Sequence, residues 1–203
     1  MEHICKPLNE NNSNATTQRA PHLSGDLFIW YIILLEGATF GLLFVVFAFV
    51  RLQNMELFDA SQRQLDVSAG AINTALLLTA SWCVVRAVQA VRASRRGAAF
   101  AWLGAVIACG GSFVALKLLE YADMTTQGIG LSTNLFFDFY FLLTGFHLMH
   151  ALAGLFALCM VGIGLARQQR PTLNPHAIET AAAFWHLVDL LWLVLFPLVY
   201  VLR

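Results

Sequence analysis

Charged residues are scarce in this sequence, and neither sign of charge is in excess. Asp, Glu, Lys and Arg make up 12% of the 203 residues, against about 25% in soluble domains. Hydrophobic residues make up 59%, which indicates a membrane protein. Because acidic and basic residues balance at 12 each, we expect no nucleic acid as a partner.

Motifs of self-sufficient chemistry are also missing. Cys5, Cys83, Cys109 and Cys159 form no CxxC pair, so neither a zinc knuckle nor a c-type haem attachment site is predicted. The chain has no P-loop, GxSxG or HExxH motif, which are the usual signatures of phosphate binding, acyl transfer and zinc catalysis. We therefore expect no catalytic residue and no metal site.

The start of the chain lacks a secretory signal, which would need a basic start followed by a short apolar core. It is polar instead and rich in Asn, Thr and Gln. We expect residues 1–23 to form a disordered tail. Residues 24–203 show no internal repeat, and we expect them to form a single transmembrane domain.

Five apolar runs are long enough to cross a bilayer, which takes about 20 helical residues. They are Leu27–Val50, Ile72–Val91, Phe100–Leu119, Leu135–Leu165 and Ala181–Leu202. Within lipid, backbone N–H and C=O groups must bond inside their own segment, which favours helices. The sequence therefore predicts an all-α integral membrane bundle of five transmembrane helices.

Lys and Arg are distributed unevenly between the two ends of this bundle. The tail, the second connection and the fourth connection share one end and hold Lys6, Arg19, Arg92, Arg95, Arg96, Arg167 and Arg170. The opposite end holds Arg51, Arg63 and Arg203. Because positive residues favour the cytoplasmic side, we expect the N-terminus inside and the C-terminus outside.

Glu36 is the tenth residue of the first apolar run, so it lies about 15 Å into the membrane. A charged group at that depth costs about 2.5–3.5 kcal/mol on insertion scales and needs a partner or water. Two interpretations are open. The side chain either handles protons or contacts lipid headgroups, or it is a protonated acid that hydrogen-bonds a neighbouring helix.

Imidazole and carboxyl groups recur at a three-residue spacing on the last two runs. His147 and His150 share a face of the fourth run, and His186 and Asp189 repeat the spacing on the fifth. We expect Glu36, His150, His186 and Asp189 to meet in one buried cluster that fixes helix packing, with Asp189 accepting a hydrogen bond from His186. A b-type haem between His147 or His150 and His186 is the alternative, which the large flanking side chains disfavour.

Other polar and small residues are predicted to act in packing. Asn73 and Thr74 are placed to bond between helices. Arg86 and Lys117 are interpreted as cations that either snorkel or pair locally, Lys117 with Glu120. Pro197 is expected to bend the last helix. Close helix approach is predicted at the glycine pairs Gly37/Gly41 and Gly110/Gly111.

Several segments resemble subunit III of the haem-copper oxidase superfamily, over about residues 24–203. Phe146–Gly154 resembles the FHxxHxxxG stretch, Phe184–Trp192 the WHFxDxxW signature, and Lys117–Tyr121 the K/GxxEY segment. Glu36 matches the intramembrane glutamate of the first helix in the five-helix core.

Within that family, two short segments look most like the NorE-type branch, whose members are associated with nitric oxide reductase and denitrification. These segments are Leu57–Gln62 and Gly70–Thr74.

The resemblance implies a noncatalytic accessory subunit in a bacterial inner membrane. Such subunits have no haem or metal of their own, pack beside a haem-containing catalytic subunit I, hold phospholipid, and support assembly and proton uptake. The lipid- or proton-linked residues would be Glu36, His147, His150, His186 and Asp189. A stand-alone b-haem membrane anchor and a small proton channel or transporter are the other hypotheses.

Overall fold

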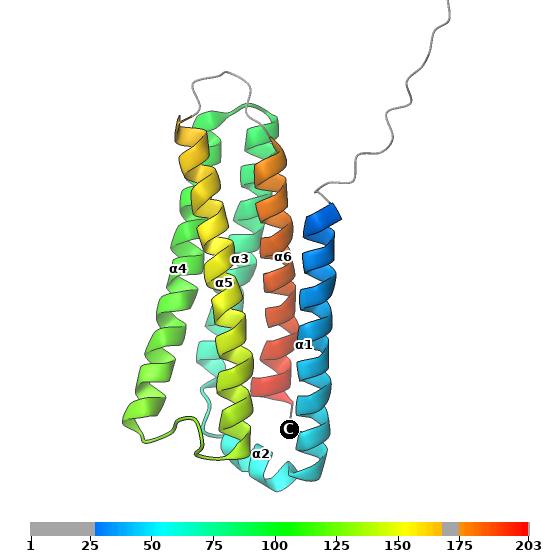
Figure 1. Cartoon of the computed structure of the whole chain (residues 1–203). Coiled ribbons are helices and arrows are strands. Elements are labelled where there is room, and N and C mark those ends of the chain that lie inside the picture. Colours follow the sequence, from blue (N-terminus) through cyan, green and yellow to red (C-terminus); the bar gives the residue numbers. More distant parts are fainter. Residues whose placement is uncertain (1–26, 168–174, 203) are drawn as a thin grey trace, which may run out of the picture.

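The computed structural model of the chain describes residues 27–167 and 175–202, and all regular elements in these ranges are helices (Figure 1). The predicted tail, residues 1–23, lies outside them. The elements are α1 (Leu27–Gln53), α2 (Met55–Gln62), α3 (Val67–Arg92), α4 (Arg96–Thr126), α5 (Leu135–Arg167), α6 (Pro175–Phe196) and the π-helical turn η1 (Pro197–Val201).

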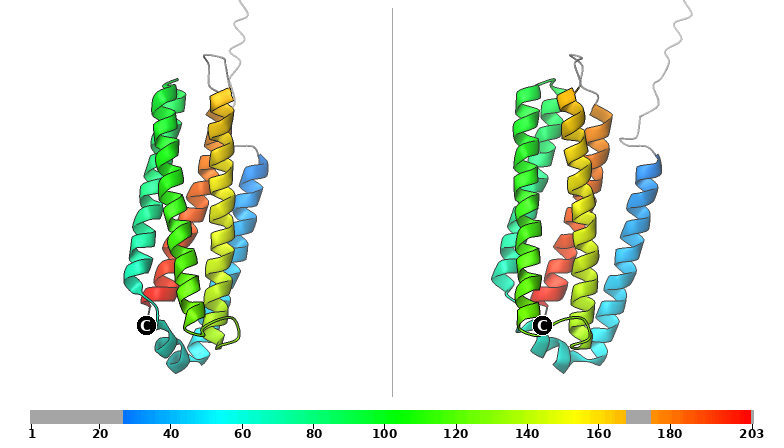
Figure 2. Two further views of the ribbon diagram at one scale, coloured as in Figure 1. Left: turned by 90° about the vertical axis from the view of Figure 1, so that its left-hand side faces the viewer. Right: turned by 60° about the vertical axis from the view of Figure 1, so that its left-hand side comes forward.

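Five helices of the described segments are long and apolar enough to cross a membrane, namely α1, α3, α4, α5 and α6 with η1. This confirms the predicted all-α bundle of five transmembrane helices. The helices run alongside one another, and the start of α1 and the C-terminal end of the chain lie at opposite ends of the bundle (Figures 1 and 2). Which end faces the cytoplasm stays a prediction of the Lys and Arg distribution.

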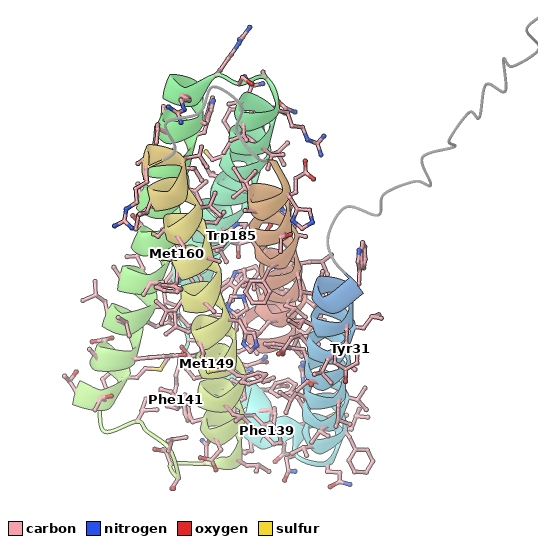
Figure 3. The ribbon with its side chains drawn as sticks, turned by 45° about the horizontal axis from the view of Figure 1, so that its top comes forward. Tyr31, Phe139, Phe141, Met149, Met160 and Trp185 are labelled. Atoms are coloured by element: carbon pink, nitrogen blue, oxygen red, sulfur yellow. The ribbon has the colours of Figure 1, made fainter. Side chains whose placement is uncertain are left out.

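The four helices α3, α4, α5 and α6 form the packed core, and α1 lies on its outside beside α6. Only 11% of the apolar window of α1 is buried, against 44% for the α6–η1 span. Tyr31 on α1 is 65% exposed, whereas Trp185 on α6 is 1% exposed (Figure 3). Most of the surface of α1 is therefore available to lipid or to another protein.

The short helix α2 is an element that the sequence pattern did not predict. Its eight residues carry both charged and apolar side chains, so they resemble an ordinary polar connection. Phe58 of α2 is fully buried and packs its ring 5.4 Å from Phe47 on α1 and 5.4 Å from Phe136 on α5. α2 thus closes one end of the bundle by inserting an aromatic side chain between two spans.

The last span changes its winding at Pro197, where α6 ends and η1 begins. Proline has no N–H and its ring disturbs the preceding turn, and a single π-helical turn is a common way to absorb that disturbance. Gln62 of α2 donates from Nε2 to the carbonyl oxygen of Val199 at 2.9 Å. A side chain of α2 therefore bonds directly to the backbone of this π-helical turn.

Glycine permits close packing at positions that only partly match the prediction. A Cβ built on Gly110 would lie 2.9 Å from Cη2 of Trp185, and one built on Gly70 would lie 2.7 Å from Cε2 of Phe196. The prediction of close helix approach is therefore right for Gly110, and it did not include Gly70. It is wrong for three glycines whose added Cβ would meet nothing within 4 Å: Gly37, Gly41 and Gly111.

Candidate functional site

Glu36 and His150 form a polar contact between α1 and α5. Glu36 Oε2 lies 3.0 Å from His150 Nε2, and His150 Nδ1 lies 2.7 Å from the carbonyl oxygen of Phe146. A carbonyl only accepts hydrogen bonds, so Nδ1 carries a hydrogen. One further proton is then shared between Oε2 and Nε2, which makes the contact either a carboxylate with an imidazolium or a carboxylic acid with a neutral imidazole.

Aromatic rings surround this pair on the side of the bundle. The His150 ring lies 5.5 Å from Phe40 and 4.6 Å from Phe146, both edge-on. The His150 side chain is 8% exposed, while that of Glu36 is 23% exposed. The imidazole is thus enclosed by protein, and the carboxyl group reaches the outer edge of the bundle.

His186 and Asp189 belong to a different interface, between α3 and α6. His186 Nδ1 lies 2.6 Å from the Oγ of Ser81, and the buried Asp189 Oδ1 has no hydrogen-bond partner in the ranges that the structure covers. The expected single cluster is therefore only partly right: Glu36 and His150 meet as predicted, but His186 bonds elsewhere. The two groups lie on separate helix interfaces, and the hydrogen-bond partner of His186 is Ser81 rather than Asp189.

His147 joins α5 to α6 through the backbone. Its Nε2 lies 3.1 Å from the carbonyl oxygen of Val188, and its side chain is fully buried. The ring packs 5.8 Å from Phe113 and 5.0 Å from Trp192. Because these aromatic side chains fill the space beside the ring, the site does not fit a porphyrin ligated by His147.

Residues 27–167 and 175–202 contain no group of three or more His, Cys, Asp or Glu side chains placed to hold a metal ion. The histidines of the last two spans instead bond to protein groups on α1, α3 and α6.

Lys117 of α4 is the centre of a second polar group, which we term the Lys117 network (Lys117, Glu120, Tyr140 and Tyr200). Its Nζ donates to Glu120 Oε2 at 3.1 Å, to the Tyr140 hydroxyl at 3.0 Å and to the Tyr200 hydroxyl at 2.5 Å. The lysine side chain is fully buried. The local pair with Glu120 is thereby confirmed, and the snorkelling interpretation of Lys117 is wrong.

The Glu120 carboxylate completes the Lys117 network. Its Oε1 accepts from the Tyr140 hydroxyl and from the Tyr200 hydroxyl, each at 2.7 Å. The ammonium group also lies 4.8 Å from the centre of the Tyr140 ring and 5.2 Å from that of Tyr200, within the range of cation–π attraction. The network therefore neutralises a buried charge and ties together α4, α5 and η1.

Asn73 is buried, but its Oδ1 finds no hydrogen-bond partner within the residues described. The neighbouring Thr74 makes the contact between helices, because its Oγ1 accepts from Trp192 Nε1 at 3.0 Å. The bond between helices predicted for Thr74 is thereby confirmed, whereas sequence reasoning missed Trp192 as its partner and the roles of Tyr140 and Tyr200. All three aromatic residues have a polar tip within an apolar span, a pattern that calls for a partner when buried.

These contacts define a multi-pass helical membrane protein whose buried polar groups lie at the interfaces between spans. Comparison with known sequences also indicates a multi-pass membrane protein. The profile of the cytochrome c oxidase subunit III family matches residues 64–203, and the chain belongs to this family. This confirms the resemblance to haem-copper oxidase subunit III.

Three relatives illustrate the relationship. The chain is 32% identical over 143 residues to cytochrome c oxidase subunit 3 of Synechocystis sp., covering 68% of this chain and 59% of that protein, which is less than two thirds of its length. It is 28% identical over 206 aligned positions to quinol oxidase subunit 3 of Bacillus subtilis, and this alignment covers 100% of this chain and 98% of that protein. It is 25% identical over 180 residues to heme-copper oxidase subunit I+III of Aeropyrum pernix, and this alignment covers 85% of this chain and 22% of that protein.

Proposed function

We propose that this chain is a noncatalytic accessory subunit of a haem-copper oxidase-type respiratory complex in a bacterial inner membrane. Its partner would be a haem-containing catalytic subunit I, which supplies the haem and metal. The name of the Aeropyrum pernix relative, subunit I+III, supports a side-by-side arrangement of the two subunits. So does the exposed apolar surface of α1, which offers area for contact within the membrane.

The observation that carries a more specific role is the contact of Glu36 with His150. The pair shares one proton near the middle of a lipid-exposed helix. A proton-sharing pair within a membrane span is a functional candidate by default, because carboxyl groups in hydrocarbon are costly. We propose that it is linked to proton uptake by the catalytic subunit or to a phospholipid held beside α1.

The other residues predicted as lipid- or proton-linked have partners or positions that suit packing better. His147 bonds to a backbone carbonyl, and His186 bonds to Ser81. Asp189 is buried on α6. We propose that these three residues position the spans rather than move protons.

Purification of the tagged full-length chain from its native membrane in a mild detergent tests the accessory role. We expect a catalytic subunit with haem to co-purify, which mass spectrometry and a visible spectrum would identify. Recovery of the chain without such a subunit would refute the proposal. Oxygen and nitric oxide consumption by the complex would then distinguish an oxidase from a nitric oxide reductase, the partner that the NorE-type resemblance suggests.

The same preparation tests the proton-linked role. In the complex with Glu36→Gln, we expect the subunits to remain together while turnover falls under a proton gradient. Asp189→Asn is the matched control, since it removes a carboxyl group from the α3–α6 interface.

The two alternative functions have direct assays on the isolated chain. A stand-alone haem anchor would show a reduced b-type haem band that is lost in His186→Ala. A proton channel or transporter would pass protons in proteoliposomes and would stop doing so in Glu36→Gln.

A further inference from the structure

Arg86 is a guanidinium within the span of α3, six residues before the helix ends at Arg92. At the helical rise it lies about 9 Å from that end. Its side chain is exposed on the outer surface of the bundle. Arginine stays charged at this depth, and a charge there needs an anion or water.

Two tryptophans hold this guanidinium in place. The centre of the Arg86 guanidinium lies 5.8 Å from the Trp82 ring of α3 and 5.4 Å from the Trp102 ring of α4. The two indoles pack edge-on at 5.1 Å. Cation–π contacts use the flat face of the guanidinium and leave its N–H donors at the edge available for an acceptor.

Two other arginines of the bundle are paired with carboxylates, and Arg86 differs from them. Arg51 pairs with Asp59 at 3.4 Å, and Arg92 pairs with Glu179 at 2.9 Å. Over residues 27–167 and 175–202 no carboxylate forms an ion pair with Arg86 or with Arg95.

A groove of about 330 Å³ lies beside Arg86, between the end of α3 and the start of α4. Arg86, Gln89, Arg95 and Trp102 supply its polar and aromatic lining, and the remaining walls are alanine. This end of the bundle carries the α3–α4 turn at the top of Figure 1. The groove thus combines two cations, an amide and an indole, without an acid, at the level where a span leaves the hydrocarbon.

We propose that this groove binds the phosphate of an acidic phospholipid, with Arg86 and Arg95 as the cationic ligands and Trp82 and Trp102 as the aromatic support. An arginine fork bonds two phosphate oxygens at once, and basic pockets between spans suit acidic headgroups. Tryptophan rings favour the same interfacial depth. The site requires only that the chain spans a membrane, so it stands apart from the proposed role in a respiratory complex.

The test compares lipid retention by the purified full-length chain in detergent. Native mass spectrometry after addition of phosphatidylglycerol should show bound lipid in the wild-type chain and about tenfold less in Arg86→Gln, the loss expected for one charge-assisted contact. Arg86→Lys keeps the charge and should retain more lipid than Arg86→Gln. Arg63→Gln, which removes an exposed arginine at the C-cap of α2, is the matched control and should bind like wild type.

Four outcomes would overturn the proposal. Equal retention of phosphatidylglycerol by wild type and Arg86→Gln would show that Arg86 is not a ligand. Equal retention of phosphatidylcholine and phosphatidylglycerol by wild type would remove the preference for acidic lipid. Protection of wild type against thermal unfolding by inorganic phosphate alone, to the level given by phosphatidylglycerol, would indicate a free-anion site. An unchanged lipid signal with loss of a co-purifying protein in Arg86→Gln would assign the groove to a protein partner instead.

Discussion

Lys117 and Tyr200 are separated by 83 residues in the chain, and their Nζ and hydroxyl oxygen lie 2.5 Å apart. The contact brings the end of α4 to the π-helical turn η1. A lysine that lies fully buried in a span is stabilised only by the groups that surround it, here Glu120 and the two tyrosine hydroxyls. The Lys117 network should therefore respond to substitution as a unit.

We expect Lys117→Met and Glu120→Gln each to lower the free energy of unfolding by about 3 kcal/mol, because each leaves the opposite buried charge without its partner. The double variant should lose clearly less than the sum of the two single changes. Unfolding of the purified chain by detergent titration measures all three. Additive losses would mean that the two side chains do not act together.

We expect Glu36→Gln to keep the stability of the wild-type chain, because the glutamine amide can donate to His150 Nε2 in place of a carboxylic acid. Glu36→Leu should lower the free energy of unfolding by about 0.6 kcal/mol, the average for a hydrogen bond between membrane helices. The same detergent titration provides the measurement. A larger loss in Glu36→Gln than in Glu36→Leu would contradict a shared hydrogen bond as the stabilising contact.

The adjacent residues Gly110 and Gly111 offer a matched comparison on α4. Gly110→Ala should destabilise the chain by about 1–3 kcal/mol, since its Cβ would meet Trp185 at 2.9 Å and force a buried indole to move. Gly111→Ala should change stability by less than about 1 kcal/mol, since open space surrounds it. Thermal unfolding of both variants checks the difference, and equal losses would contradict the packing described.

Gln62 provides a test of the contact between α2 and η1. Gln62→Leu removes the donor to the Val199 carbonyl, and we expect a loss of about 1 kcal/mol together with faster proteolysis near the C-terminal end. Gln64→Leu, at an exposed position just beyond α2, is the control and should leave both measurements unchanged. Identical behaviour of the two variants would show that α2 does not hold the π-helical turn.

The spans were predictable because their length and apolar composition follow directly from the thickness of the bilayer. The predicted run Leu135–Leu165 and the helix Leu135–Arg167 differ by two residues at one end. α2 was missed because eight mixed residues carry no comparable signal, and burial of Phe58 depends on spans that are distant in the sequence.

The polar residues were predictable, but only some of their partners were: the pairs Lys117–Glu120 and Glu36–His150 were expected, whereas the tyrosines around Lys117 and the Ser81 partner of His186 were not. Glu36, His150 and Lys117 stand out in the sequence because they are costly in lipid. Their contacts depend on the rotation of each helix about its own axis, which weakly patterned apolar spans do not reveal. The rotation of α4 likewise decides that Gly110 faces Trp185 while Gly111 faces open space.

The position of α1 outside the packed core has a consequence for the biosynthesis and membrane insertion of the protein. Ribosomes synthesise α1 before α5, the helix that carries His150, which follows more than a hundred residues later along the printed sequence. During that interval the Glu36 carboxyl group enters the bilayer without its imidazole partner, where a polar side chain is costly. Docking of α5 beside α1 then supplies the imidazole, so the later synthesis of a histidine completes the anchoring of α1.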